Sequence, residues 1–279
     1  MTVPEPETSH YETHWEYFKE LLQIIRKIIH EKYKLSNVSI RPIGSNASRL
    51  SIPVKIVGVN DKGEKAIYFG KILGSSDLIT ARSIQLFKNV YLQMNAQDPI
   101  FGAQKSAEEM AREQYEMLRA ILDAGVPTAR PYGYHPINGQ LWLVVAEFLD
   151  ATPITASSTV TDVQMDSVFR YLKRMHRKGI FHGDIKPDNI MFGDKIYLLD
   201  VGRFREGVPS AKKLAYDLAC MICSFLECKP SEEIVRMARK YYSRGQLRAA
   251  AKYLDLVQRR PDINFTDETK NELLRLLNR

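Results

Sequence analysis

The chain has 279 residues, of which 44% are hydrophobic and 26% charged, which excludes a disordered or fibrous protein and predicts two lobes or domains of about 150 residues each. No run approaches the roughly 18 apolar residues of a membrane-spanning helix, and the start MTVPEPETSH lacks the pattern of a secretion signal, so we expect a cytoplasmic protein. The net charge of +7 makes it moderately basic.

The N-terminal half predicts one amphipathic helix, three strands and two further helices. Apolar residues recur at helical spacing over residues 13–33. Segments 38–43, 50–59 and 65–73 have strand patterns, and the turn NDKG joins the last two as a hairpin. Helices are expected at 76–94 and 106–124, the second ending before Gly125-Val126-Pro127.

The C-terminal half predicts mostly helix. A strand at 141–148 leads into the polar stretch LDATPITASSTV, which we interpret as a linker. A helix follows at 162–178, with apolar side chains expected to point inward: Val163, Val168, Tyr171, Leu172 and Met175. A hairpin (190–192 and 196–199) and a helical remainder complete the chain, so the fold class is α+β.

The excess of basic residues is uneven. One group lies in the predicted helix at 162–178 (Arg170, Lys173, Arg174, Arg177, Lys178), and a second group lies in the C-terminal region (Arg236, Arg239, Lys240, Arg244, Arg248, Lys252, Arg259, Arg260). We interpret both as solvated helix faces, and an anionic partner such as RNA, an acidic protein or a membrane surface stays open as the alternative.

Three cysteines, Cys220, Cys223 and Cys228, lie in the apolar run LAYDLACMICSFLEC. A metal site would need a fourth ligand and usually a turn between ligands. The run instead has a helical pattern, so we expect the cysteines to pack in the core.

The stretch HGDIKPDN, residues 182–189, concentrates polar groups that suit phosphoryl transfer. That reaction needs an acid to orient and deprotonate the attacking hydroxyl, and oxygen ligands for magnesium. Asp184 could supply the first, and Asn189 and Asp200 the second. The hairpin between Asn189 and Asp200 would bring those two residues to the same end.

The run HGDIKPDNIMF…IYLLDVG resembles the catalytic loop and magnesium-binding segment of the protein-kinase-like superfamily. The resemblance implies a bilobal fold, with a β-rich N-lobe at 38–149 and a helical C-lobe at 150–228. Residues 1–37 and 229–279 lie outside the resemblance, and we expect them to form helical extensions. The resemblance also implies an ATP-dependent kinase using Mg²⁺ or Mn²⁺, with Asp184 as base, Lys186 as the cation on the migrating phosphoryl group, and Asn189 and Asp200 as metal ligands.

The same resemblance assigns nucleotide-binding roles upstream. Lys71, in the strand AIYFGKIL, would hold the α and β phosphates, and Glu113 would pair with it, with Glu109 and Glu116 as alternatives on the same helix face. Val145 would border the adenine pocket, and the backbone of Glu147, Phe148 and Leu149 would bond the base. The glycine-rich phosphate loop of the superfamily is represented only by Gly44, Ser45, Asn46, Ala47 and Ser48.

Departures from the typical protein kinase indicate an atypical branch. Gly183 stands where an arginine is usual, and Asp217, which resembles the acid that braces the catalytic loop, follows Asp200 after a short segment. These features are similar to RIO-type kinases and to aminoglycoside and choline phosphotransferases. Lys186 instead matches serine/threonine protein kinases.

For the acceptor we expect a serine or threonine hydroxyl on a protein, including autophosphorylation. The alternatives are a small-molecule or lipid-headgroup hydroxyl, or an ATPase or nucleotide-binding component of a larger complex, with or without RNA. Basic residues on the short segment after Asp200 indicate an anionic acceptor (Arg203, Arg205, Lys212, Lys213).

Overall fold

The computed structural model describes residues 8–43, 51–74, 106–156 and 159–279, with side chains from residue 19 onward. These residues form two compact units. Unit 1 contains residues 8–43, 51–74, 106–112 and 131–148, and unit 2 contains 113–130, 149–156 and 159–279.

Unit 1 is built on a five-stranded antiparallel sheet in the order β1-β2-β3-β5-β4. Its strands are β1 (Ser36–Pro42), β2 (Ser51–Val59), β3 (Lys65–Gly74), β4 (Pro131–Pro136) and β5 (Leu141–Glu147). The hairpin between β2 and β3 is set by Asn60, whose Oδ1 accepts hydrogen bonds from the backbone amides of Lys62 and Glu64. This side-chain turn fixes the register that places Lys71 opposite Val144 of β5.

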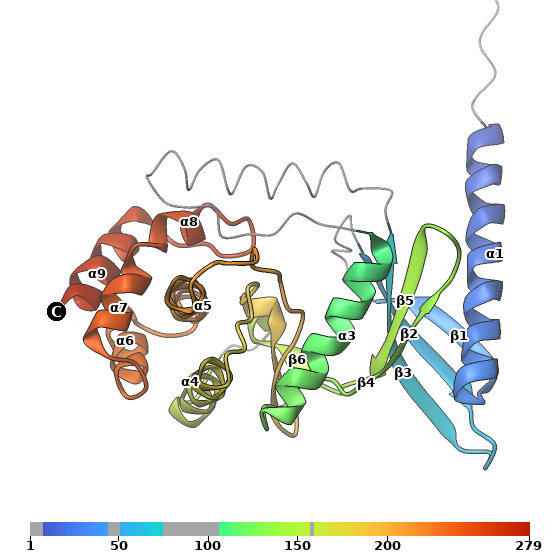
Figure 1. The fold of residues 1–279 in the computed structure, drawn as a ribbon, viewed down its shortest axis with the longest axis horizontal. Helices are drawn as coiled ribbons and strands as arrows, with labels where there is room; N and C mark the ends of the chain where they lie inside the picture. The colour runs from blue at the N-terminus through green and yellow to red at the C-terminus, as the bar shows by residue number, and fades with distance from the viewer. Residues whose placement is uncertain (1–7, 44–50, 75–105, 157–158) are drawn as a thin grey trace, which may run out of the picture. The chain divides into compact units, whose positions relative to one another are not determined.

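Helix α1 (Thr8–Tyr33) lies against this sheet (Figure 1). Leu21, Ile25 and Ile29 repeat at four-residue spacing and are buried in one cluster with apolar side chains of the sheet, among them Ile56 and Leu143. The apolar stripe thus explains both the helix and its packing.

Helix α3 (Ala107–Asp123) begins at a cap formed by Ser106, whose backbone amide bonds the Glu109 carboxylate and whose hydroxyl accepts from the Glu109 amide. It ends where Gly125 takes φ of +72°, a left-handed conformation that suits glycine. Residues 107–112 belong to unit 1 and the rest of the helix to unit 2.

Unit 2 contains one short sheet, of strands β6 (Thr152–Pro153), β7 (Ile190–Phe192) and β8 (Ile196–Leu198). Single 3₁₀ turns occupy Ile154–Ala156 and Pro187–Asn189. The long helices are α4 (Asp162–Arg177), α5 (Ser210–Cys223), α6 (Ser231–Arg239), α7 (Arg244–Ala251) and α9 (Asp267–Asn278), and the shorter α8 spans Leu254–Gln258.

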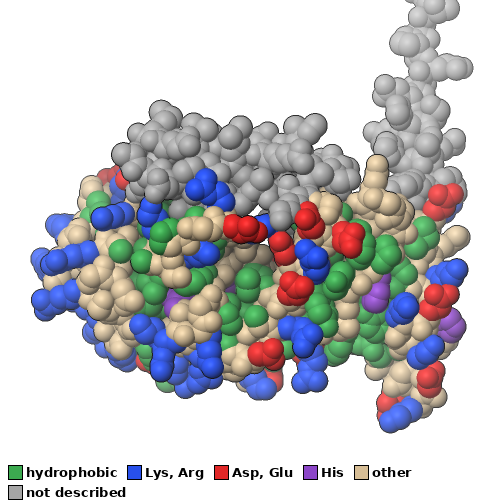
Figure 2. Space-filling view, in the orientation of Figure 1, with side chains coloured by type: hydrophobic (Ala, Val, Ile, Leu, Met, Phe, Trp, Pro, Cys, Tyr) green, Lys and Arg blue, Asp and Glu red, His purple; other side chains and the backbone are tan. Residues whose placement is uncertain are grey.

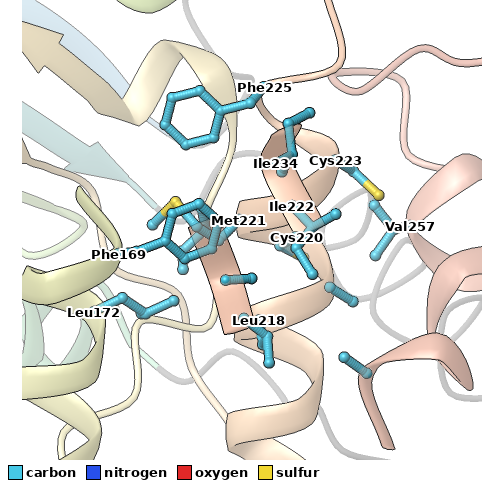
Figure 3. Packing of buried hydrophobic residues seen from close by; sticks show 14 of the residues in the cluster. Phe169, Leu172, Leu218, Cys220, Met221, Ile222, Cys223, Phe225, Ile234 and Val257 are labelled. Atoms are coloured by element: carbon cyan, nitrogen blue, oxygen red, sulfur yellow. The ribbon is translucent and has the colours of Figure 1, made fainter. Parts of the chain in front are cut away.

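Helix α5 forms the centre of the core of unit 2. Leu218, Met221 and Ile222 are fully buried, and Figure 3 shows Phe169 and Leu172 of α4 and Val257 of α8 on the surrounding elements. Every residue of α5 from Ala215 to Cys223 is buried, so the core surrounds this part of the helix.

Cys220 and Cys223 are buried in this core, as expected, and Cys228 is half-buried. Burial raises the pKa of the Cys220 thiol to about 12 and raises that of Cys223 well above its ordinary value, so neither forms a thiolate at neutral pH. We expect a thiol reagent such as Ellman's to modify one cysteine in the native protein, Cys228, and all three in denaturant. Rapid native modification of two or more thiols would contradict this packing.

Most of the predicted elements are confirmed within two residues, and α1 begins earlier than expected. Three differences occur. Val163 is 77% exposed, so its expected inward position is wrong. β4 was not predicted, and the expected linker contains β6 and a 3₁₀ turn. The predicted helix at 76–94 lies outside the described residues.

No helix among the described ranges has both the length and the apolar character to cross a bilayer. Lys and Arg side chains gather over the helical unit 2, on the face shown in Figure 2. Several basic residues of unit 2 have acidic partners: Lys229 and Arg236 contact Asp162, and Lys240 contacts Asp166. Arg260, by contrast, is buried, so its expected place on a solvated face is wrong.

Candidate active site

The segment 182–189 lies between α4 and β7, and one buried carboxylate fixes its start. Asp217 of α5 is fully buried and accepts hydrogen bonds from the backbone amides of His182, at 2.7 Å, and Gly183, at 2.8 Å. His176 Nε2 lies 3.2 Å from the same carboxylate, and Tyr242 OH contacts the other ring nitrogen of His176. Asp217 therefore braces the loop, as the sequence predicts.

Gly183 is required by the local geometry. Its φ is +75°, and an added Cβ would lie 3.0 Å from the carbonyl carbon of Gly202. Gly202 has as little room for a side chain, since its own added Cβ would lie 2.8 Å from the Gly183 oxygen. The Gly202 amide also donates a hydrogen bond to the His182 carbonyl, at 2.8 Å. The two glycines let the 182–189 loop and the segment after β8 touch backbone to backbone. An arginine at position 183 would not fit this arrangement.

The structure brings Asn189 and Asp200 together. Asn189 is buried, and its Nδ2 donates to the backbone oxygens of Asp184, at 2.8 Å, and Asp200, at 3.2 Å. Asp200 has φ of +54°, an uncommon conformation for a residue other than glycine. Strained backbone of this kind is typical of functional sites. Asp200 follows the β7–β8 hairpin, as expected.

These two residues fit a divalent cation by donor type. An amide oxygen and a carboxylate are hard oxygen ligands of the kind that Mg²⁺ and Mn²⁺ take, with further positions filled by water and substrate phosphates. Among the described residues no group of three or more His, Cys, Asp or Glu side chains could hold a metal ion by itself. A site made from Asn189 and Asp200 would therefore need further ligands from water or a bound substrate.

His182 is neutral in this environment. Burial lowers the pKa of its imidazole, and the nearby carboxylates of Asp217, Asp184 and Asp200 oppose that shift without reversing it. Its Nδ1 is 3.4 Å from the Asp184 amide. We therefore regard His182 as a packing residue of the loop and not as a proton carrier.

Asp184 and Lys186 are the partly exposed residues of the loop, with 33% and 26% of their side chains accessible. Asp184 Oδ1 lies 2.8 Å from Arg260 Nη2, and Lys186 Nζ lies 3.5 Å from Asp262. Sequence reasoning placed Arg260 and Asp262 in an extension outside the catalytic region and missed both contacts. The only sequence signal is an Arg-Pro-Asp segment set between the apolar residues Val257 and Ile263.

Glu113 is half-buried on α3 and contacts Arg203 at 2.7 Å. Of the two alternatives, Glu109 is used in the helix cap and Glu116 is exposed. The adjacent Gln114 reaches Asp200 Oδ1 at 3.5 Å. Glu113 is thus the glutamate that faces the segment after β8, and its pairing with Lys71 stays a prediction.

The remaining predicted nucleotide-binding residues belong to unit 1, apart from Leu149. Lys71 is half-buried in β3, and Val145 is fully buried in β5, which ends at Glu147. Lys55 lies over the Phe148 ring, 4.2 Å from its centroid. Leu149 begins the next segment of unit 2. The predicted phosphate loop, Gly44 to Ser48, lies outside the described residues.

The fold and the comparisons together indicate a class: the chain is similar to the protein-kinase-like superfamily and to its atypical members. More particularly, residues 107–245 match the model of the lipopolysaccharide kinase (Kdo/WaaP) family, just under half of the chain. The putative fructosamine-3-kinase of Haemophilus somnus has the same fold, with a TM-score of 0.52 at 13% identity, covering 94% of this chain and 98% of that one.

Curated relatives are similar over part of the chain. The 3-deoxy-D-manno-octulosonic acid kinase of Xylella fastidiosa is 19% identical over 136 residues, which cover 46% of this chain and 55% of that kinase. Serine/threonine-protein kinase D of Synechocystis is 24% identical over 144 residues, covering 48% and 28%. The chain spans about half or less of the length of these relatives.

Proposed function

We propose that the protein is a kinase that transfers the γ-phosphate of ATP to a hydroxyl group. The observation that carries this proposal is the constellation around residues 182–200: a partly exposed carboxylate at Asp184, with Asn189 bonded to the backbone of both Asp184 and Asp200. The match to a kinase family over these same residues supports it.

In this mechanism Asp184 accepts a hydrogen bond from the acceptor hydroxyl, orients it, and takes its proton as the phosphoryl group moves. Lys186 offsets the negative charge on the migrating group. Asn189 and Asp200 hold the divalent cation, which supplies charge neutralisation for the triphosphate when bound. Lys71 anchors the phosphates, Glu113 orients Lys71, residues 44–48 cover the phosphates, and Val145 with the backbone of 147–149 binds adenine.

For the acceptor we favour serine or threonine on a protein, including this chain itself. Lys186 stands two residues after the base, at the position where serine/threonine protein kinases carry lysine. A relative with that activity in its name, serine/threonine-protein kinase D, supports the same choice.

A sugar hydroxyl is the second candidate. It is favoured by the lipopolysaccharide kinase family match and by the similarity to a 3-deoxy-D-manno-octulosonic acid kinase. Arg205, which is exposed, and the partly exposed Lys213 lie on the segment that follows Asp200 and would suit an acidic acceptor of either kind.

The test uses γ-labelled ATP and Mg²⁺ with the full chain alone, with casein, and with free 3-deoxy-D-manno-octulosonic acid. Acid-stable phosphoserine or phosphothreonine on the chain or on casein is the expected result. Label confined to the sugar would replace this acceptor by the second candidate. Label appearing only as inorganic phosphate would overturn the kinase proposal in favour of an ATPase.

A further inference from the structure

Arg260 is a buried arginine from the C-terminal region that contacts the proposed base. It follows α8, and its side chain is only 3% exposed. Its guanidinium Nη2 lies 2.8 Å from Asp184 Oδ1, a contact between residues 76 positions apart. A side chain buried to this extent is not placed to touch a substrate, so any effect of Arg260 on the reaction passes through the residues that it contacts.

Every nitrogen of the Arg260 guanidinium has a partner. Nε and Nη2 bond the two oxygens of Asp262, both at 2.8 Å, which is the bidentate arrangement that arginine and carboxylate favour. Nη1 contacts Tyr216 OH at 3.1 Å and Cys220 Sγ at 3.6 Å, both on α5. The Arg260 guanidinium is therefore held by α5 on one side and by Asp262 on the other. Its Nη2 also bonds Asp184.

The charges in this group balance. Burial alone lowers the pKa of Arg260, but the hydrogen bond to Asp262 and the charge of Asp184 oppose burial, so the net shift is upward and the guanidinium stays charged. Burial raises the pKa values of Tyr216 and Cys220, so these two stay neutral. Two carboxylates, Asp184 and Asp262, thus face two cations, Arg260 and Lys186, which contacts Asp262 at 3.5 Å.

The backbone around Arg260 is anchored as well. The amide of Arg260 bonds the Val257 carbonyl at 3.0 Å, and Ile263, two residues after the rigid Pro261, is buried in the core. The segment from Arg260 to Asp262 is therefore a fixed part of unit 2 and holds both side chains in place.

We propose that Arg260 and Asp262 form a positioning clamp for the two partly exposed residues of the catalytic loop, Asp184 and Lys186. The proposal rests on the proposed kinase function. Arg260 engages Oδ1 of Asp184 and so directs Oδ2 to the acceptor hydroxyl, while Asp262 restrains the Lys186 ammonium. The C-terminal region is on this account part of the catalytic apparatus.

The test compares Arg260→Met, Arg260→Lys and Asp262→Asn with Arg259→Met, a matched control at the neighbouring, exposed arginine. Loss of the clamp lets the base move by an ångström or so, which lowers kcat about 100-fold in Arg260→Met, with KM for ATP changed less than about twofold. Arg260→Lys keeps the positive charge but lacks the planar set of donors of the guanidinium. Its kcat should therefore lie between those of Arg260→Met and the wild type. Arg259→Met keeps wild-type kinetics.

Hydrogen–deuterium exchange of the peptide containing residues 182–189 gives a readout independent of turnover. We expect faster exchange in Arg260→Met and wild-type exchange in Arg259→Met. Wild-type kcat together with unchanged exchange in Arg260→Met would overturn the clamp while the kinase proposal stands. A wild-type protein without phosphotransfer would overturn the kinase proposal, and the clamp with it. If Arg260→Met does not fold, Arg260→Lys and Asp262→Asn take its place in the test. Wild-type kcat and unchanged exchange of residues 182–189 in both variants would then overturn the clamp.

Discussion

Asp184→Asn is expected to reduce phosphotransfer by about 10²- to 10⁴-fold, the range for loss of a general base. The amide is close in size to the carboxylate but cannot take the acceptor proton. Nucleotide binding should persist, because the Asn189 amide bonds the backbone oxygen of residue 184 and not its side chain. Initial-rate kinetics with labelled ATP measure the first effect, and titration calorimetry with Mg²⁺ and a non-hydrolysable ATP analogue measures the second.

Asp188→Asn is the matched control for that variant. It lies in the same loop, is exposed, and accepts a hydrogen bond from Thr155 at 3.1 Å, which an asparagine oxygen can also accept. Its kcat should stay within about twofold of the wild type. If Asp184→Asn retained full activity, or if both variants lost activity equally, Asp184 would not be the base.

Asp217→Asn is expected to lower the free energy of unfolding by about 3 kcal/mol and to reduce activity as well. The carboxylate accepts from two backbone amides of the catalytic loop and from His176 inside the core, and it is fully buried. An asparagine turns an NH₂ group toward at least one of these donors and leaves it unsatisfied. Urea denaturation followed by circular dichroism measures the change.

Asp255→Asn supplies the comparison for stability. Its side chain is 62% exposed, and its contact with Lys270 at 3.0 Å is shared with Asp267. The change in unfolding free energy should stay within about 0.5 kcal/mol, as for other exposed ion pairs. Equal loss of stability in the two variants would mean that Asp217 does not brace the loop through its buried hydrogen bonds.

The parts of the site that the sequence could predict are formed by residues close together in the sequence. Asp184, Asn189 and Asp200 come together through one loop and one tight hairpin, so residue type and spacing indicate their proximity. Asp217 was recognised by its resemblance to the bracing acid, and the structure confirms its contact with the loop.

The parts that sequence could not predict depend on packing between distant segments. The contact of Arg260 with Asp184 arises only because α5 and α8 pack together in the core, and a basic C-terminal stretch looks like a solvated face. Strand β4 begins and ends with proline, which argues against a strand but is compatible with its place at the sheet edge. Val163 lies in the first turn of α4, where its apolar character did not lead to burial.

The most direct test of the central claim is to follow the γ-phosphate of ATP by phosphorus NMR, with Mg²⁺, the wild-type chain and the acceptors named above. We expect the γ-phosphate signal to decay while a phosphomonoester signal grows in equal amount, and we expect neither change with Asp184→Asn. Decay into inorganic phosphate alone, or no decay in the wild type, would contradict the proposed kinase function.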